Sequence, residues 1–367
     1  VVSFDSNGLA NSGGNIYTVT LTGVKNATLS DVFSYKTLST TISWDNMGSD
    51  NIVSKAEKAS YSLSGTVSNP ANLSGLQISS IVFTSLDGTQ ITVSSNLPVI
   101  DTNTGAWSLS HSNMPSLADG KYTVTVNFSA NGGYTKSVTH AKAVVIDTVE
   151  PTLSEAEADG NTITLTMDEY LNESSIPTAS DFTVDGNTVT AVAVDGNKVT
   201  LTLASAVSDT TTVNYTGSSL EDNNGNDVAT FNSTIGTSGD DTIVGTSANE
   251  ILTGGGGHDT YDYSSTDIGS SDIITDFTLG DASTDNSDRL DLRDLLTNYS
   301  SGDLSAWIQV TDSNGTEAGG DIVLKIDKDG SNSFDNPDTT ITLKGLGGTA
   351  ASLDVDTFFD SYNIMAV

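Results

Sequence analysis

The stretch Gly236–Asp262 reads GTSGDDTIV GTSANEILT GGGGHDTYD, which is three consecutive units of nine residues. The sixth position of the units holds Asp241, Glu250 and Asp259, and the eighth is apolar or aromatic in every unit. Glycine-rich loops followed by an inward-pointing apolar residue at a fixed spacing are typical of a parallel β-roll. Because two units make one turn of such a roll, the first and third loops should stack and bring Asp241 beside Asp259.

The same loops are rich in oxygen ligands for a cation. Carboxylates, and backbone carbonyls that glycine lets turn inward, suit Ca²⁺ better than Zn²⁺ or Mg²⁺. The middle unit departs from the pattern, with Ala248 in place of glycine and Glu250 in place of aspartate. A glycine- and aspartate-rich surface loop is the alternative, but the apolar eighth position recurs in phase, which favours the roll. The calcium ligands expected from the repeats are Gly236, Ser238, Asp240, Asp241, Glu250, Gly254, Gly256, His258 and Asp259.

This segment resembles the RTX calcium-binding repeats of bacterial proteins that leave the cell by type I secretion. The sequence that follows, SSDIITDFTLGDASTDNSDRLDLRDLL at 270–296, is similar to the element that follows the repeats in that family. The resemblance adds Asp272 and Asp276 to the expected ligands. It covers about the last third of the chain and implies that the roll folds when it meets external calcium.

The composition limits the partners of the chain. Its 367 residues include 47 Asp and Glu but only 13 Lys and Arg, a net charge of −34. Nucleic acid and anionic membrane surfaces both need a basic surface, so neither is an expected partner. No apolar run is long enough for membrane insertion. Cysteine is absent, so bound calcium is expected to stabilise the fold where disulfides otherwise would. The sequence begins at Val1 without a signal peptide, which predicts a fragment of a longer chain or a processed product.

Alternating polar and apolar residues at Ile16–Val24 and Ser39–Trp44 predict strands. Residues 1–44 are too few for a whole sandwich, so they are either the end of an upstream module or strands donated to the next one. The polar segment 45–60 then allows two interpretations. It is either a calcium-stiffened junction or an ordinary polar linker; the ligands of the junction would be Asp45, Asp50 and Glu57.

Residues 61–148 have the strand pattern of a complete β-sandwich. With the junction segment before them, they form an expected domain at 45–148. Asp-Gly and Asn-Gly pairs at 87–88, 119–120 and 131–132 predict turns with positive φ. The sequence LADGKY, ending at Tyr122, predicts a tyrosine corner, and Trp107 is a candidate core anchor. These signatures resemble bacterial Ig-like repeats.

The chain changes module at the DTVEPT segment, where a proline follows an acidic turn. Hairpins with Asp-Gly turns at 185–186 and 195–196 fill residues 149–235, which resemble the SWM-type repeat, another Ig-like surface module. Its closing loop, EDNNGND, either holds Ca²⁺ through Asp222 and Asp227 or is a turn satisfied by Asn and Gly. Asp147, at the change of module, is a further expected ligand.

After the roll, which we place at 236–280, the last region at 281–367 contains a predicted hairpin pair. The IDKDG sequence within it is similar to half of an EF-hand loop, but Asp338 stands where the glutamate at position twelve is expected. A hairpin is therefore the preferred interpretation, with Asp327 and Asp329 as candidate ligands of an added Ca²⁺. The C-terminal sequence SLDVDTFFDSYNIMAV resembles the uncleaved export signal of type I substrates.

The sequence contains no motif of a hydrolase. Neither H-E-x-x-H nor G-x-S-x-G occurs, which argues against the RTX metalloproteases and lipases. A thiol nucleophile is excluded because there is no cysteine. Of the three histidines, His111 and His140 lie on predicted strands and His258 lies at the variable fifth position of a repeat. The chain is therefore expected not to be an enzyme.

The sequence thus predicts an all-β chain: tandem Ig-like β-sandwiches, a short calcium-binding parallel β-roll and a β-rich C-terminal secretion domain. The resemblance implies an extracellular, cell-surface adhesin segment that is exported by the type I secretion machinery. Such a segment would take part in biofilm formation. Its partner would be a surface ligand that the sequence does not name, or another copy of itself. The alternatives are a subunit of an S-layer or extracellular filament, and the non-catalytic tail of a secreted RTX enzyme.

Overall fold

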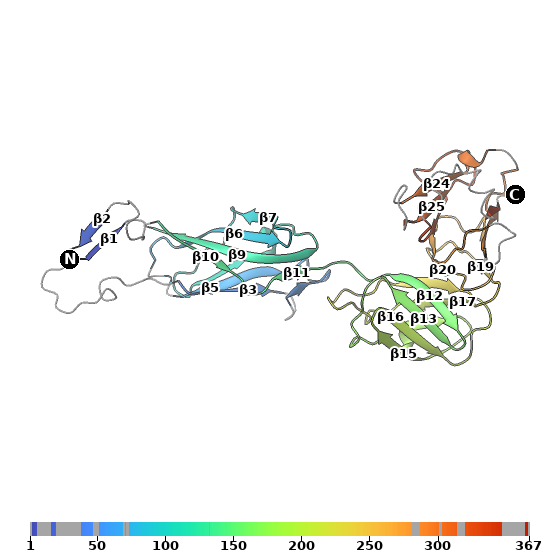
Figure 1. Cartoon of the computed structure of the whole chain (residues 1–367), viewed down its shortest axis with the longest axis horizontal. Helices are drawn as coiled ribbons and strands as arrows, with labels where there is room; N and C mark the ends of the chain where they lie inside the picture. The colour runs from blue at the N-terminus through green and yellow to red at the C-terminus, as the bar shows by residue number, and fades with distance from the viewer. Residues whose placement is uncertain are drawn as a thin grey trace. The chain divides into compact units, whose positions relative to one another are not determined.

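The computed structural model describes residues 2–5, 16–19, 38–46, 51–68, 70, 73–131, 133–280, 287–300, 303–313, 320–346 and 364–365. Within these residues the regular secondary structure consists of β-strands and single 3₁₀ turns, with no α-helix, as predicted (Figure 1). It divides into two compact units. Unit 1 combines Val1–Met47 with Ser60–Val145, and unit 2 combines Gly48–Ala59 with Ile146–Val367.

Unit 1 is an Ig-like sandwich of antiparallel strands. Its first sheet has the order β3 (Thr40–Asp45), β5 (Ser62–Val67) and β8 (Ala106–Leu109). Within unit 1, the strands of its second sheet have the order β11 (Val144–Ile146), β9 (Gly120–Ala130), β6 (Gln77–Ser85) and β7 (Gln90–Val93), with β10 (Tyr134–Thr139) also paired to β9. The short η2 turn (His111–Asn113) follows β8, and β1 (Val2–Asp5) pairs with β2 (Ile16–Val19).

The expected anchors of this sandwich are confirmed. Trp107 is 3% exposed, and the Tyr122 hydroxyl donates a 3.0 Å hydrogen bond to the carbonyl of Ala118, which closes the tyrosine corner. Strand β3 pairs with β5 of the same chain. The strand predicted at Ser39–Trp44 therefore joins the sandwich that follows it. Residues 20–24 of the other predicted strand lie outside the described residues.

Unit 2 begins with a second sandwich, which we call the module. One of its sheets has the order β12 (Leu153–Asp159), β13 (Thr162–Met167), β16 (Lys198–Leu203) and β15 (Val189–Asp195). The facing strands are β14 (Phe182–Val184), β17 (Thr211–Tyr215) and β18 (Phe231–Ile235), and η3 (Ala179–Asp181) precedes β14. Gly186 and Gly196 have φ of 68° and 62°, so both predicted turns are confirmed. The short strand β4 (Ile52–Val53) also belongs to unit 2.

The sheet of β14, β17 and β18 does not end with the module. It continues in parallel through β20 (Ile251–Thr253), β22 (Ser271–Ile274) and β26 (Thr339–Leu343), and then antiparallel through β25 (Ile322–Ile326) and β24 (Ile308–Asp312). It has eight strands in all. The hairpins predicted after the roll are β24, β25 and β26, with η4 (Leu304–Ala306) before them.

A second parallel sheet faces this one. Its strands are β19 (Thr242–Val244), β21 (Thr260–Ser264), β23 (Arg289–Asp294) and β27 (Ile364–Met365). From β18 to β23 the chain alternates between the two sheets, which is the coiled path expected for a roll. The eighth positions Ile243, Leu252 and Tyr261 are each 0% exposed, so they form the core between the sheets as the sequence predicted. No helix in the described ranges is long and apolar enough to span a membrane.

Candidate metal centres

Three carboxylates from distant parts of the sequence converge in unit 2. One oxygen each of Asp147, Glu169 and Asp222 lies within 4.8 Å of the others. Among the described residues, this is the one group of three His, Cys, Asp or Glu side chains that converges so closely. We call it the three-carboxylate centre. It contains two of the ligands expected from the sequence, and it adds Glu169.

Local hydrogen bonds hold two of these carboxylates in place. The Asp147 N–H donates to the Val53 carbonyl at 3.0 Å, and the Asp147 carboxylate accepts from the Asn224 side-chain amide. Asp222, which is 0% exposed, begins the turn EDNNGND. Its Oδ1 accepts the N–H groups of Asn224 and Asn226 at 2.7 and 2.8 Å. This loop is therefore a turn satisfied by its own asparagines, and the same turn aims Asp222 at the centre.

Lys55, in the predicted junction segment, lies beside this turn. The Lys55 N–H donates to Asn226 Oδ1 at 2.7 Å, and Lys55 Nζ pairs with Glu150 at 2.6 Å. The Glu57 carboxylate accepts from the N–H and hydroxyl of Ser54. Of the other two expected junction ligands, Asp45 lies in β3 of unit 1 and is not among the three carboxylates of the centre, while Asp50 lies outside the described residues.

Electrostatics at the centre favour a bound positive charge. Burial, together with the smaller effect of the nearby charges of Asp222, Asp147 and Asp168, raises the pKa of Glu169 to about 7. The neighbouring carboxylates therefore oppose the ionisation of Glu169. A divalent cation would neutralise two of these charges and remove that penalty.

The first and third repeat loops stack as the sequence predicted. The Asp241 N–H donates to Asp259 Oδ1 at 2.9 Å, and the His258 N–H donates to Asp240 Oδ1 at 2.9 Å. A Cβ built on Gly236 would lie 2.1 Å from the carbonyl oxygen of Gly254. Only glycine allows the two backbones to approach so closely.

This contact between acids repeats along one edge of the roll, which we call the first edge. The Asp259 N–H in turn donates to Asp288 Oδ1 at 3.0 Å, so Asp241, Asp259 and Asp288 form a ladder. Asp276, another expected ligand, instead accepts the N–H groups of Gly254 and Gly255 at 3.1 and 2.8 Å.

The opposite edge of the roll, the second edge, carries a matching ladder. The Glu250 N–H donates to Asp272 Oδ1 at 2.9 Å, and Glu250 Oε1 accepts from the Asn232 side-chain amide at 3.3 Å. Glu250 and Asp272 are 3% and 0% exposed. Both ladders therefore place acidic side chains in positions closed to bulk water.

Burial makes these acids hard to ionise. It raises the pKa of Asp259 to about 7 and that of Asp272 to about 6, although hydrogen bonds from backbone N–H groups work in the opposite direction. Burial also raises the pKa of Glu250 and Asp288. Without a cation, the ionised roll has buried negative charges in both ladders.

The remaining expected ligands have other partners. Asp327 accepts the N–H of Ser333 at 2.5 Å and the hydroxyl of Ser331 at 2.9 Å, and Asp329 accepts the N–H of Ser331 at 3.0 Å. The loop at Asp327 is therefore organised by its own N–H groups.

Two further expected ligands lie elsewhere. Asp227 is exposed and does not belong to the three-carboxylate centre. The ring Nδ1 of His258 lies 2.9 Å from the Ser287 carbonyl.

Two residues of these arrangements were missed by sequence reasoning. Asp288 could have been found, because an acid two positions before an inward apolar residue is the repeat pattern itself, and Asp288 stands in this relation to Leu290. Glu169 has no such signal, since it lies far along the chain from both Asp147 and Asp222.

These pKa values predict how stability depends on pH without calcium. Glu169, Asp259 and Asp272 bind protons more tightly in the folded chain than in the unfolded one. The folded state therefore holds more protons between about pH 4 and pH 7, and the free energy of unfolding falls as pH rises through this window. We expect unit 2 to melt at least about 5 °C lower at pH 8 than at pH 5 in calcium-free buffer.

Differential scanning calorimetry of the whole chain measures this change. Unit 1 is an internal control, because hydrogen bonds lower the pKa of its carboxyls Asp87 and Asp101. If the melting temperature of unit 2 stays constant or rises from pH 5 to pH 8, the predicted effect of the buried acids is contradicted.

The comparisons with known proteins support one part of the sequence assignment. Residues 146–219 match the SWM repeat family, described as "Putative flagellar system-associated repeat". This match supports the resemblance of the module to the SWM-type repeat over these residues. A search of the curated proteins finds no match.

Two solved chains of a marsupial T cell receptor are also similar, each at 12% identity. The first comparison covers 53% of this chain and 95% of the receptor chain, with a TM-score of 0.22. The second covers 48% and 59%, with a TM-score of 0.21. At these scores the similarity carries no argument about fold or function.

Proposed function

We propose that this chain is a calcium-stabilised segment of an extracellular bacterial surface protein, exported by a type I secretion system and acting as a non-catalytic adhesin part. The module of the surface-associated type supports the location. The three-carboxylate centre is the observation that carries the calcium dependence. The stacked repeat loops and their buried acids support a second set of calcium sites in the roll.

The geometry of the three-carboxylate centre fits a calcium ion. Oxygen ligands lie 2.3–2.6 Å from Ca²⁺, so two ligands on opposite sides of one ion are about 4.6–5.2 Å apart. The oxygens of Asp147, Glu169 and Asp222 lie within 4.8 Å of one another and can therefore surround a single ion. The centre joins the start of the module to its closing turn. Bound calcium would hold these segments together and stiffen the entry to the module.

The roll offers a different kind of site. Its acids lie in ladders, and the other ligands of each ion would be backbone carbonyls of stacked loops such as those at Gly236 and Gly254. Because the cation-free ladders contain buried acids, calcium binding and folding are linked. A chain that is poorly folded in a calcium-poor cytosol and folds outside the cell suits export through a narrow channel.

The Glu169→Gln variant tests the three-carboxylate centre. The amide keeps the size of the side chain and removes one of three charges, and charge count sets the affinity of such sites. We expect isothermal titration calorimetry to show one calcium site weakened at least about tenfold, which is about 1.4 kcal/mol. Glu155→Gln, on the exposed face of β12, is the matched control and should bind calcium like the parent chain. Equal calcium binding by the Glu169 variant and the parent would remove the centre from the proposal.

The alternative, a subunit that assembles into an S-layer or filament, makes a different prediction. Size-exclusion chromatography with light scattering, first in calcium-free buffer and then in millimolar calcium, separates the two. A monomer that becomes more compact supports the adhesin segment, and large calcium-dependent species support assembly. A catalytic domain encoded upstream in the same gene would favour the third interpretation, the tail of a secreted enzyme.

A further inference from the structure

We propose that the last strand of the module, β18, is the first strand of the roll, and that the folded module is the template on which the roll forms. The domain boundary expected from the sequence separates the residues up to 235 from those that start at 236. The hydrogen bonds, the side-chain ladder and the apolar packing all cross that boundary.

The nonapeptide frame extends backwards into the module. Counting nine residues back from Gly236 gives DVATFNSTI at 227–235, in which Asn232 takes the sixth position. Asn232 stands eighteen residues before Glu250, the same interval that separates Asp241 from Asp259. Strand β18 therefore occupies the register of an earlier repeat, with an amide where the repeats have an acid and with Thr234 where they have the apolar eighth residue.

The backbone follows this frame. In the parallel pairing of β18 with β20, Ser233, Thr234 and Ile235 lie opposite Ile251, Leu252 and Thr253. The Gly236 N–H then donates to the Thr253 carbonyl at 2.8 Å. On its other side, β18 pairs antiparallel with β17 inside the module. One strand thus completes the module sheet and starts the roll sheet.

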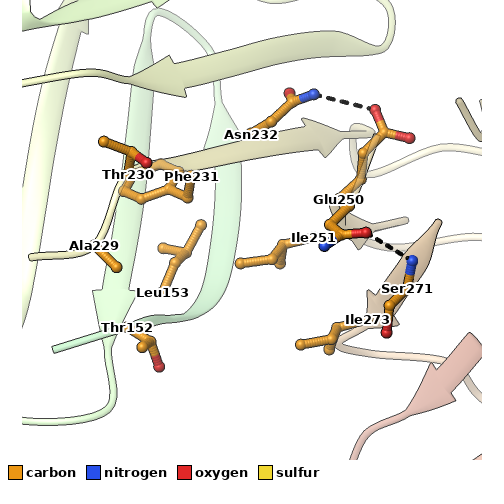
Figure 2. A pocket seen from close by; sticks show the side chains of 11 residues that line it. Thr152, Leu153, Ala229, Thr230, Phe231, Asn232, Glu250, Ile251, Ser271 and Ile273 are labelled. Carbon is orange, nitrogen blue, oxygen red and sulfur yellow. Dashed lines mark hydrogen bonds between the residues drawn. The ribbon is translucent and has the colours of Figure 1, made fainter. Parts of the chain in front are cut away.

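The side chains extend the second-edge ladder into the module. Asn232 donates to Glu250, as Figure 2 shows, and Glu250 is joined to Asp272. The Asn232 Oδ1 atom is buried and has no hydrogen-bond partner. Its amide satisfies a buried carboxylate of the first roll turn without adding another charge. This is a suitable end for a ladder of acids.

Apolar side chains also meet at the same boundary. Ile251 from the roll packs against the core of the module, as does Phe231 from β18. In Figure 2, Leu153 and Phe231 from the module line one pocket with Ile251 and Ile273 from the roll. The cavity between them is about 340 Å³. The outer face of β20 and β22 is thus partly covered by the module.

The other sheet of the roll has no such support. Among the described strands, β19 pairs only with β21. Strands β19 and β20 have three residues each, and isolated pairs of short strands are marginally stable in water. The first turn of the roll therefore gains its main external support from β18. One element of this inference rests on the proposed function, namely that calcium drives the folding of the roll.

Hydrogen exchange of the whole chain, read by mass spectrometry, tests the template. Leu201→Ala, in β16 of the module, removes a fully buried side chain that is not part of the roll. Leu63→Ala, in β5 of unit 1, is the matched control, since that leucine is equally buried. If the module is the template, Leu201→Ala lowers the protection of β20 and β22 by about 30-fold or more, together with that of β17. Leu63→Ala leaves all three unchanged.

Full protection of β20 and β22 in the Leu201→Ala variant overturns the proposal. If that variant unfolds the module completely, the comparison still decides, because a self-sufficient roll stays protected and a templated roll does not. The measurement is made with and without added calcium. A parent chain whose exchange does not respond to calcium would contradict the calcium proposal, while the two variants would still test the template.

Discussion

Gly255→Ala is expected to destabilise unit 2 by more than about 3 kcal/mol and to abolish the cooperative unfolding of the roll. Gly255 has a φ of 92°, where a residue with a Cβ is strained. A Cβ at this position would also lie 2.0 Å from the carbonyl oxygen of Thr237 in the loop stacked on it. That neighbour is backbone and cannot rotate away. The two loops must therefore separate, and their ladder contacts must lengthen with them.

Gly239→Ala is the matched control in the same pair of loops. A Cβ there would meet only the Thr237 hydroxyl, at 3.9 Å, so the change should cost less than about 1 kcal/mol. Chemical denaturation followed by circular dichroism, in calcium, measures both variants. Equal stability of the two would show that the loops are not packed as closely as this structure has them.

Asp259→Asn is expected to change stability in opposite directions with and without calcium. In calcium-free buffer at pH 8 the variant should be more stable than the parent, because Asp259 is 1% exposed and burial raises its pKa to about 7. The amide oxygen can still accept the N–H of Asp241. In millimolar calcium the order should reverse, because the variant has lost a charged ligand.

The gain that calcium gives the parent should be about 2.7 kcal/mol for each independent site at a hundred times its dissociation constant. The variant should lose most of that gain at the first edge. Asp195→Asn, an exposed position in β15, is the control and should leave both conditions unchanged. Lower stability of the Asp259 variant in both conditions would assign Asp259 a structural role only.

The roll could be predicted from the sequence because its signal is periodic. Three units in register fixed the inward residues and the stacking of Asp241 on Asp259, and both are present. The predicted turns at Gly88, Gly186 and Gly196, all with positive φ, and the tyrosine corner were equally readable, since each depends on neighbours within a few residues. Gly120 instead begins β9, and Gly132 lies outside the described residues. Features that depend on neighbouring residues, or that repeat at a short interval, can be recognised in a single sequence.

The rest depends on contacts between distant residues. The three-carboxylate centre requires Glu169 to meet Asp147 and Asp222, and only the folded module brings them together. The sequence allows two roles for Asp222, a calcium ligand or part of a turn; in the structure it makes the hydrogen bonds of the turn and also lies in the three-carboxylate centre. The segment around Lys55 packs on unit 2, although its position in the sequence suggested a part of the preceding sandwich.

The eight-stranded sheet also decides how this chain can be divided. A fragment that starts at Gly236 would lose β18 and leave the backbone of β20 as an open edge beside the half-buried side chains of Ile251 and Ile273. Open edges with apolar faces pair with other copies. Such a fragment would precipitate or form mixed oligomers in calcium, even where the same residues fold correctly in the longer chain. A piece to be studied alone must therefore keep the module, the Gly48–Ala59 segment of unit 2 and also β3, which pairs with β5 of unit 1, so it starts before Thr40.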